Sequence, residues 1–577
     1  MQRALIAALA LAGSLALAPH AGAAGPADPL FRLLPPDAGI ALAVENLRDR
    51  YREVAASPLA DGLGRLPHVS TWLNSNPIRG VQRVVRQVEG GLNLAPGSIR
   101  DELFGDAVVL ALRPGPPDAP EQARGVLLGR ARDRAIRDRL IQSVDESQLG
   151  NGELSAVERK RRGPEGYAVR KYARAGRPDE FYATFDDGTF AWSNSEGLIH
   201  DILDRKAGGG PSLADAPGFR SVREALPAQA LVGLYLSPRL LEASLGLDGR
   251  KSATTQERII GLFARYVAAL DYMGIALAWD RGVALHVHES IEPSRLDGWL
   301  RDWMTRPSAA SPAIAPLPGS ALAAFVIHLD FVALRDAAAG LVAERDLPWF
   351  RNLKSAAQGL LAGLDLDSVV LPRLGPGVLL FAEEPVQADA RTRLPLVAVI
   401  GVKPGPETPG TAAAIENAIR TGISIYALEP AQASARLRVE SRALGVARVL
   451  VLLNARRTLF ALTSGPDRVV LGNLPESVAR FGTQSAPSSL EAIRAANFPE
   501  ATTFGVVDLS RAAAAIKPLR ASIAERLAKR GRRSVEAIVT DLDQIVAAAE
   551  MFSAATFTAT ASPDATSVHR VFRLIAR

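Results

Sequence analysis

The segment best spaced for metal chemistry is HVHESIE, residues 286–292. Alternate residues of a β-strand project from one face, so His286, His288, Ser290 and Glu292 would lie together if the segment is a strand. Imidazoles about 6.6 Å apart, from the rise of a strand, can reach a shared ion. The helical spacing of a His-Glu-x-x-His zinc motif is lost in a strand, however. We therefore favour the polar outer face of a hairpin strand over a metal site.

Two further histidines have an acidic residue close by in the sequence. His200 and Asp201 are adjacent on a predicted helix and point about 100° apart, which places them poorly as an acid/base pair. His328 and Asp330 would share a strand face where the second half of the chain begins, and the first half has Glu45 near the position of His328. We interpret both pairs as solvated or hydrogen-bonded residues rather than as catalytic groups.

The remaining polar clusters fit turns, loops and solvated faces. Asp186-Asp187-Gly188 is typical of a hairpin turn, because glycine tolerates the positive φ that such turns require. Asp365 and Asp367 precede a predicted strand and supply too few oxygen ligands for calcium. Gly208–Pro211 lacks the preceding strand and following helix of a phosphate site. The basic run Arg159–Arg162 has the composition of a solvated loop without the interleaved aromatics of a nucleic-acid contact.

Motifs of the commonest enzymes are missing from the sequence. It has no G-x-S-x-G elbow, Walker A loop, dinucleotide fingerprint, H-E-x-x-H helix or EF-hand loop. Without cysteine there is no disulfide, thiolate metal site or cysteine nucleophile. We assign no catalytic, cofactor-binding or metal-ligating residue and expect no cofactor. The sequence favours a non-catalytic binding or scaffolding protein, and the alternative is a hydrolase whose site assembles from distant residues.

The N-terminus is typical of a secretory signal peptide. Arg3 is positively charged, Ala4–Ala18 is apolar, and Ala21-Gly22-Ala23 fits the cleavage pattern. An uncleaved anchor is the alternative, although about fifteen apolar residues fall short of the roughly twenty that span a membrane. We expect residues 1–23 to be removed, leaving a periplasmic or secreted cell-envelope protein with no integral membrane span. Its partner would be an envelope protein, a peptide or a glycan, and not nucleic acid.

Composition predicts globular domains. The residues are 48% hydrophobic and 22% charged, a composition that excludes a mainly disordered chain. The length of 577 residues exceeds what one hydrophobic core usually supports. The 67 basic and 61 acidic residues give a net charge of +6, too balanced for a strongly basic nucleic-acid-binding protein.

The two halves of the chain share a succession of short motifs. LLPPDAGIALAVEN, starting at Leu33, has a counterpart in PLPGSALAAFVIHLD, starting at Pro316. A later pair of matching segments aligns Gly105 with Gly375. TFAWSNS, from residue 189, matches TLFALTS, from residue 458. The matches keep their order, which predicts a tandem duplication.

Each half contains short strands in hairpins, with amphipathic helices between groups of strands. This pattern predicts an α+β fold of two tandem homologous units, each a mainly antiparallel sheet with packed helices. We place the first unit at residues 26–305, a linker rich in proline and alanine at 306–318, and the second unit at 319–577.

The Leu-Pro-x-Asp/Ser opening runs into a strand soon after the signal peptide and is repeated in the second half. It resembles a group of uncharacterised exported bacterial proteins, common in planctomycete-like genomes, that are classed only as a domain of unknown function. The resemblance covers both halves. It implies an exported protein without an assigned activity, and no functional residue can be transferred from it.

Overall fold

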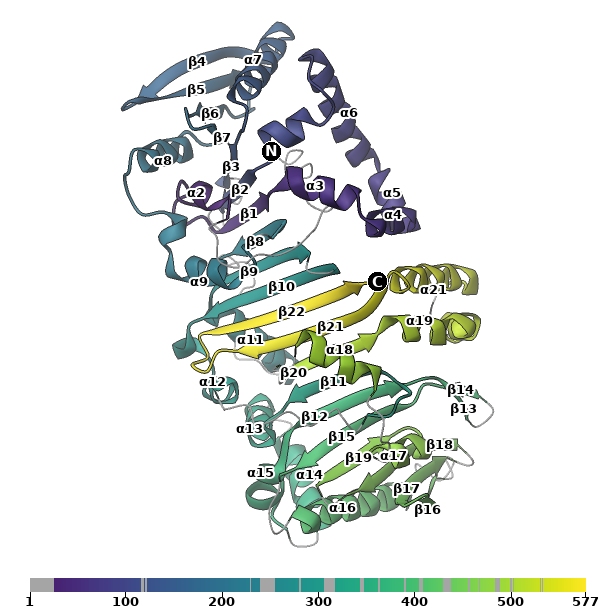
Figure 1. Ribbon diagram of the computed structural model, residues 1–577. Coiled ribbons are helices and arrows are strands. Elements are labelled where there is room, and N and C mark those ends of the chain that lie inside the picture. Colours follow the sequence, from purple (N-terminus) through teal and green to yellow (C-terminus); the bar gives the residue numbers. More distant parts are fainter. Residues whose placement is uncertain are drawn as a thin grey trace. The chain divides into compact units, whose positions relative to one another are not determined.

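The computed structural model consists of helices and antiparallel strands, and the predicted α+β class is confirmed (Figure 1). It describes residues 25–577 except 116–118, 120–121, 229, 239–254, 280–281, 306–316, 343–346, 362–363, 389–390, 404–407, 429–436, 455–456, 466, 483–487, 499–500, 502, 530 and 532. The predicted signal peptide, 1–23, and linker residues 306–316 lie outside the described residues.

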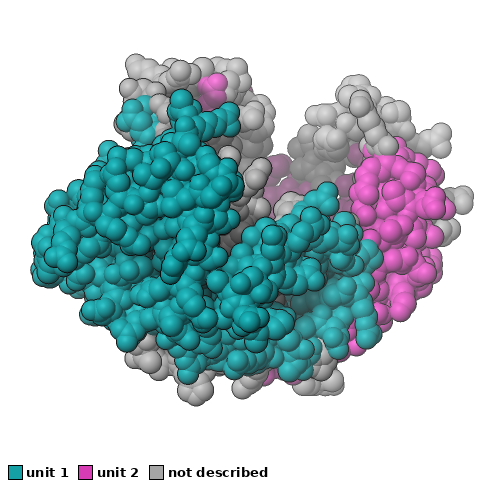
Figure 2. All heavy atoms as spheres, turned by 90° about the horizontal axis from the view of Figure 1, so that it is seen from above, with its two compact units in different colours: residues 1–248, 266–294, 567–576 teal, residues 249–265, 295–566, 577 magenta. Residues whose placement is uncertain are grey.

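The chain divides into two compact units, coloured separately in Figure 2. Unit 1 takes in residues 1–248, 266–294 and 567–576, and unit 2 takes in residues 249–265, 295–566 and 577. A strand from the C-terminal end of the chain therefore belongs to unit 1.

Unit 1 is built on antiparallel strands in the order β4-β5-β6-β7-β3-β2-β1-β8-β9-β10-β22. Their bounds are β1 (Ile40–Glu45), β2 (Ala107–Arg113), β3 (Arg124–Arg130), β4 (Leu154–Arg162), β5 (Glu165–Tyr172), β6 (Glu180–Thr184), β7 (Thr189–Ser193), β8 (Val232–Leu236), β9 (Leu270–Trp279), β10 (Gly282–Ile291) and β22 (Ser567–Ala576).

The helices of unit 1 begin at recognisable caps. The side chain of Asp133 accepts a hydrogen bond from the Ile136 amide at 3.1 Å, which starts α7, and Ser195 caps α8 in the same way. The helices are α2 (Asp28–Phe31), α3 (Leu47–Ala55), α4 (Pro58–Arg65), α5 (Pro67–Leu73), α6 (Asn76–Gly91), the π-helical turn η1 (Ile99–Leu103), α7 (Arg134–Gly150), α8 (Glu196–Lys206) and α9 (Pro217–Ala225). Helix α11 (Thr255–Ala269) belongs mostly to unit 2.

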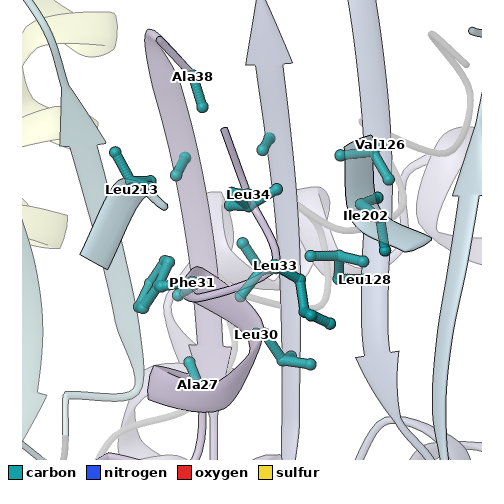
Figure 3. Close-up of a cluster of buried hydrophobic side chains, with 14 of the residues drawn as sticks. Ala27, Leu30, Phe31, Leu33, Leu34, Ala38, Val126, Leu128, Ile202 and Leu213 are labelled. Carbon is teal, nitrogen blue, oxygen red and sulfur yellow. The ribbon is translucent and has the colours of Figure 1, made fainter. Parts of the chain in front are cut away.

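The leucine-rich segment on and just after α2 forms part of the core of unit 1. Phe31, Leu33 and Leu34, on and just after α2, are buried against the face of the sheet that carries Val126 and Leu128 (Figure 3). Helices α8 and α9 cover the same face. Burial of a leucine or phenylalanine side chain contributes about 1.5–3 kcal/mol, so this short segment is a substantial part of the core.

Unit 2 has antiparallel strands in the order β16-β17-β18-β19-β15-β12-β11-β20-β21. Their bounds are β11 (Ala321–His328), β12 (Leu374–Glu383), β15 (Leu396–Val402), β16 (Leu437–Leu444), β17 (Ala447–Asn454), β18 (Arg457–Ser464), β19 (Arg468–Gly472), β20 (Thr503–Asp508) and β21 (Phe552–Ala561). A small hairpin of β13 (Val386–Ala388) and β14 (Arg391–Arg393) lies between β12 and β15.

Helices lie on both faces of the unit 2 sheet. Val478 and Phe481, in and after α17, pack on one face, and α16 packs on the other through Ala412, Ile415 and Ile419. The helices are α12 (Gly298–Thr305), α13 (Phe331–Leu341), α14 (Leu347–Leu360), the π-helical turn η6 (Leu366–Val370), α15 (Leu371–Arg373), α16 (Thr408–Leu428), α17 (Pro475–Arg480), α18 (Ser489–Asn497), α19 (Leu509–Ile516), α20 (Arg520–Ala528) and α21 (Val535–Ala549).

We found no described helix with both the length and the apolar character needed to cross a bilayer.

Candidate functional site

Three histidines meet where β10 pairs with β22 in unit 1. His288 lies directly opposite His569 across the two strands, and their ring centroids are 5.4 Å apart. His286 Nδ1 lies 3.2 Å from His569 Nε2, within hydrogen-bonding distance. The predicted strand, with His286 and His288 on one face, is therefore present. Ser290 and Glu292 lie further along the segment, Glu292 just past the end of β10.

The histidines are buried, so the prediction of a polar outer face was wrong. Strand β10 has a neighbour on each side, β9 and β22, and His286 and His288 are only 8% and 6% exposed. Burial, assisted by the neighbouring His569, lowers the pKa of His288 to about 4. Neither ring nitrogen of His288 has a hydrogen-bond partner among the described residues. Burial therefore favours the neutral imidazole at His288 and His569.

This cluster does not have the geometry of a metal site. Among the described residues, no three or more histidine or acidic side chains are placed to hold a metal ion. The charge of Arg573 also contributes, after burial, to the lowered pKa of His569, and the same charge would repel a cation. The nearest carboxylate, Glu289, is engaged by Arg570 at 2.5 Å and by the Tyr266 hydroxyl.

Acid should destabilise unit 1 through His288. Its folded-state pKa of about 4 lies below the ordinary value of about 6.5, so the unfolded chain binds the proton first as pH falls. We expect stability to be lost between about pH 6.5 and pH 4, by about 2–3 kcal/mol, and to be retained above that window. The measurement is urea denaturation across this pH range. In His288→Leu the dependence should be smaller, and an unchanged slope in that variant would contradict the assignment.

The other histidine–acid pairs are separated by their partners. His200 Nε2 lies 3.1 Å from the hydroxyl of Tyr167, and its Nδ1 lies 3.2 Å from Arg162, so its ring is turned to these groups. His328 ends β11, but Asp330 lies beyond the strand, where its carboxylate accepts the Ala333 amide at 2.8 Å and caps α13. The expectation that His328 and Asp330 share a strand face was wrong, because the helix begins there.

The remaining polar segments have structural roles. Gly188, with φ of +87°, closes the predicted turn between β6 and β7. The basic run Arg159–Arg162 is the end of strand β4 rather than a loop, and Arg162 forms an ion pair of 2.7 Å with Asp204. Asp365 caps η6 by accepting the amide of Ser368 at 2.7 Å. Asp367 pairs with Arg335 at 3.2 Å.

A buried ionic network, hereafter the Arg170 network, joins α7 to the β5–β6 hairpin. The Arg170 guanidinium is 2% exposed and donates to Asp145 at 2.8 Å and to Glu180 at 2.7 Å. The Tyr182 hydroxyl donates to the second oxygen of Asp145 at 2.8 Å, and burial raises the pKa of that hydroxyl. The ring of Trp192 stacks on Tyr182 and lies 4.7 Å from the guanidinium. Every charge in this network faces a partner, as a structural element requires.

A second buried network, hereafter the Glu45 network, ties the first described residues to the core. Arg223 lies 2.8 Å from Glu45 Oε1, while its Nη1 hydrogen is directed at the Tyr235 hydroxyl, 2.7 Å away. The same guanidinium donates to Asp28 at 2.9 Å. Glu45 also accepts the Ala27 amide at 3.2 Å. Burial raises the pKa of Glu45, and Arg223 opposes that rise.

Unit 2 contains an open apolar cavity of about 320 Å³ between the sheet and its helices. Its lining comes from α14, η6, α15, β12, β15, α16 and β19. Every described side chain of the lining is apolar: Leu360, Leu361, Leu366, Val370, Leu371, Leu374, Ile400, Ile415, Ala418, Ile419 and Val469. This volume is at the small end of the range of about 300–1,000 Å³ for ligand pockets. A cavity of this kind can bind an apolar group and offers no acid, base or nucleophile.

The sequence pattern of the lining residues is the same as that of residues in a filled core, so it could not have revealed the cavity. Leucine, isoleucine and valine at helical and strand spacing predict burial, and they do so whether or not the space between them is filled. The one local irregularity is that Leu366 and Val370 belong to a π-helical turn, a feature that often marks functional sites and that sequence does not reveal.

Comparisons with family models, with curated proteins and with solved structures gave no match to this chain.

Proposed function

We propose that this protein is an exported, non-catalytic binding protein of the cell envelope, and that the apolar cavity of unit 2 is its binding site. The observation that carries the proposal is an open space of about 320 Å³ whose described lining side chains are all apolar. Exposed apolar surface is costly in water, so a cavity that stays open to solvent is typical of a binding site.

The polar residues support the non-catalytic half of the proposal. Catalytic sites bring groups with shifted pKa values together in a cleft, with room for a substrate beside them. In the described residues, His288 and His569, whose pKa values are lowered, lie in the β10–β22 interior, while His328, whose pKa burial also lowers, ends β11 apart from them. The two buried ionic networks have their charges paired internally. A hydrolase with a site assembled from distant residues remains the alternative, and it would require a convergent set of this kind.

Filling the cavity should abolish binding. Ala418→Trp places an indole in the space, because Ala418 lines the cavity from α16. Ala413→Trp, on the exposed side of the same helix, is the matched control. Titration with Nile red should give a saturable rise in fluorescence for the unaltered protein and the control, and at least a tenfold weaker affinity for Ala418→Trp. Equal binding by both variants would refute the site.

The two units derive, in this proposal, from a duplication. Support comes from the strand order: β4-β5-β6-β7-β3-β2-β1-β8-β9 in unit 1 has the same connections as β16-β17-β18-β19-β15-β12-β11-β20-β21 in unit 2. In this alignment β7 corresponds to β19. The sequence match instead pairs TFAWSNS, which contains β7, with TLFALTS, which lies in β18, the strand before β19.

Loop hydrogen bonds support the same alignment residue by residue. The Arg132 amide donates to the Glu102 carbonyl at 2.8 Å, and the Lys403 amide donates to the Arg373 carbonyl at 2.7 Å. The Ala131 amide donates to Gly188 at 2.9 Å, and the Val402 amide donates to Asp467 at 2.7 Å. The first pair of bonds aligns Phe104, rather than Gly105, with Gly375. The second pair aligns Phe190 with Val469.

A further inference from the structure

We infer that the ligand of the unit 2 cavity is a long-chain fatty acid, whose hydrocarbon chain fills the cavity and whose carboxylate lies at Arg373 and Lys403. This inference rests on the proposed binding function and names the class of ligand. It is carried by three features of unit 2, namely the missing aromatic rings, the apolar lining and the pair of cations at α15.

Two aromatic rings that fill the equivalent place in unit 1 have no counterpart in unit 2. In unit 1, Phe190 packs with Ile99 and Leu103 of η1, and its ring centroid is 6.2 Å from that of Phe104. The fit is tight, since a side chain at Gly129 would overlap the Phe190 ring. Unit 1 therefore has a filled core at this place.

In unit 2 the aligned residues differ in size at three positions, and Ile400, which lines the cavity, stands in place of Gly129. Val370 and Leu374 replace Ile99 and Leu103 with side chains of similar size and line the cavity. Val469 stands in place of Phe190, and Gly375 in place of Phe104. Losing two phenyl rings from a packed core leaves a void unless the surroundings collapse, and here the space is retained. A retained void of defined lining is a place for a ligand rather than a packing fault.

The chemistry of the lining selects a hydrocarbon chain. None of the described lining residues is polar, so none of them could satisfy the hydroxyl groups of a sugar or the amides of a peptide. Its volume equals that of about ten water molecules at about 30 Å³ each, which suits one flexible chain better than a large fused ring system.

Two cations lie at α15, whose Leu371 lines the cavity, although neither is itself a lining residue. Arg373 sits between the lining residues Leu371 and Leu374, and its guanidinium reaches Thr411, one turn before Ile415 on α16, at 3.4 Å. The Lys403 ammonium donates to the Pro372 carbonyl at 2.7 Å. In unit 1 the aligned residues are Glu102 and Arg132, so the doubled positive charge is specific to the unit with the cavity. A carboxylate at this place would be favoured by both cations.

The test compares acids and alcohols of one chain length by displacement of Nile red from the full mature protein. Dodecanoate should bind at least tenfold more tightly than dodecanol, because charge-assisted hydrogen bonds strengthen only the acid. From octanoate to dodecanoate the affinity should rise roughly fourfold per methylene and then level off as the cavity fills. Arg373→Gln with Lys403→Gln should remove the preference for the acid and leave the affinity for dodecanol unchanged. Arg526→Gln with Lys529→Gln, in and just after α20, removes the same charge elsewhere as a control.

Val469→Phe restores the ring found in unit 1 and should weaken dodecanoate binding at least tenfold, with an unchanged circular dichroism spectrum and denaturation midpoint confirming a folded chain. If dodecanol binds as tightly as dodecanoate, or if a lysophospholipid of equal chain length binds more tightly than both, the fatty-acid inference is overturned while the proposed binding function stands. If Nile red and all the amphiphiles fail to bind, the proposed function itself is overturned.

Discussion

Replacing Arg170 with methionine should lower the free energy of unfolding of unit 1 by about 3–5 kcal/mol, because it leaves Asp145 and Glu180 without their shared cation. The guanidinium is 2% exposed, so water cannot replace the lost partner without opening the contact between α7 and the hairpin. The effect should be local, since the network joins α7, β5 and β6. Amide hydrogen exchange of those elements is the direct measurement, because it reads the stability of each element separately.

The neighbouring Lys171 provides the control for this prediction. Lys171 pairs with Glu158 at 2.5 Å, but both side chains are 42% exposed, so Lys171→Met should change stability by less than about 1 kcal/mol. Equal exchange rates in the Arg170→Met and Lys171→Met variants would show that the buried network does not hold the hairpin to α7.

Arg223→Met should destabilise unit 1 by about 3 kcal/mol or more, because it removes the cationic partner of the Glu45 carboxylate, which is 1% exposed. Burial already raises the pKa of Glu45, and loss of Arg223 removes the main influence that opposes this rise. A group whose folded pKa is raised costs stability once the pH exceeds its unfolded pKa. The deficit of the variant relative to the unaltered protein should therefore be largest at neutral pH and shrink toward about pH 4.3, the ordinary value for glutamate.

Urea denaturation at several pH values measures this second effect. The matched control is Arg220→Met. Arg220 lies one helical turn from Arg223 on α9 and donates to the Asp215 carbonyl at the surface, so its replacement should leave the free energy of unfolding almost unchanged at every pH. A deficit that does not change with pH would mean that Glu45 is not the group left unpaired.

Much of the fold could be predicted from the sequence. Hydrophobic periodicity and turn residues located the hairpins, including the Asp-Gly turn at Gly188, because these signals are local. Assigning strands to neighbours requires information about residues distant in the chain, and this is where the prediction was wrong for the histidines. The sequence of β10 predicts the second strand of a hairpin. It gives no indication that β22 pairs on the other side of β10 and buries His288 against His569.

The candidate binding site was beyond sequence reasoning for a different reason. A cavity is a property of side-chain volumes summed over several elements, and Val469 or Gly375 taken alone is an ordinary core or turn residue. Only an alignment with Phe190 and Phe104 in unit 1 makes the smaller residues meaningful, and that alignment required the strand pairings and loop hydrogen bonds.

The central claim is that the unit 2 cavity holds a natural apolar ligand, and native mass spectrometry of the protein purified from the envelope of its source tests it most directly. The account predicts one bound species per chain, identified on release as a long-chain fatty acid and lost from protein carrying Val469→Phe. A spectrum of the unliganded chain alone, both for the unaltered protein and after incubation with dodecanoate, would contradict it.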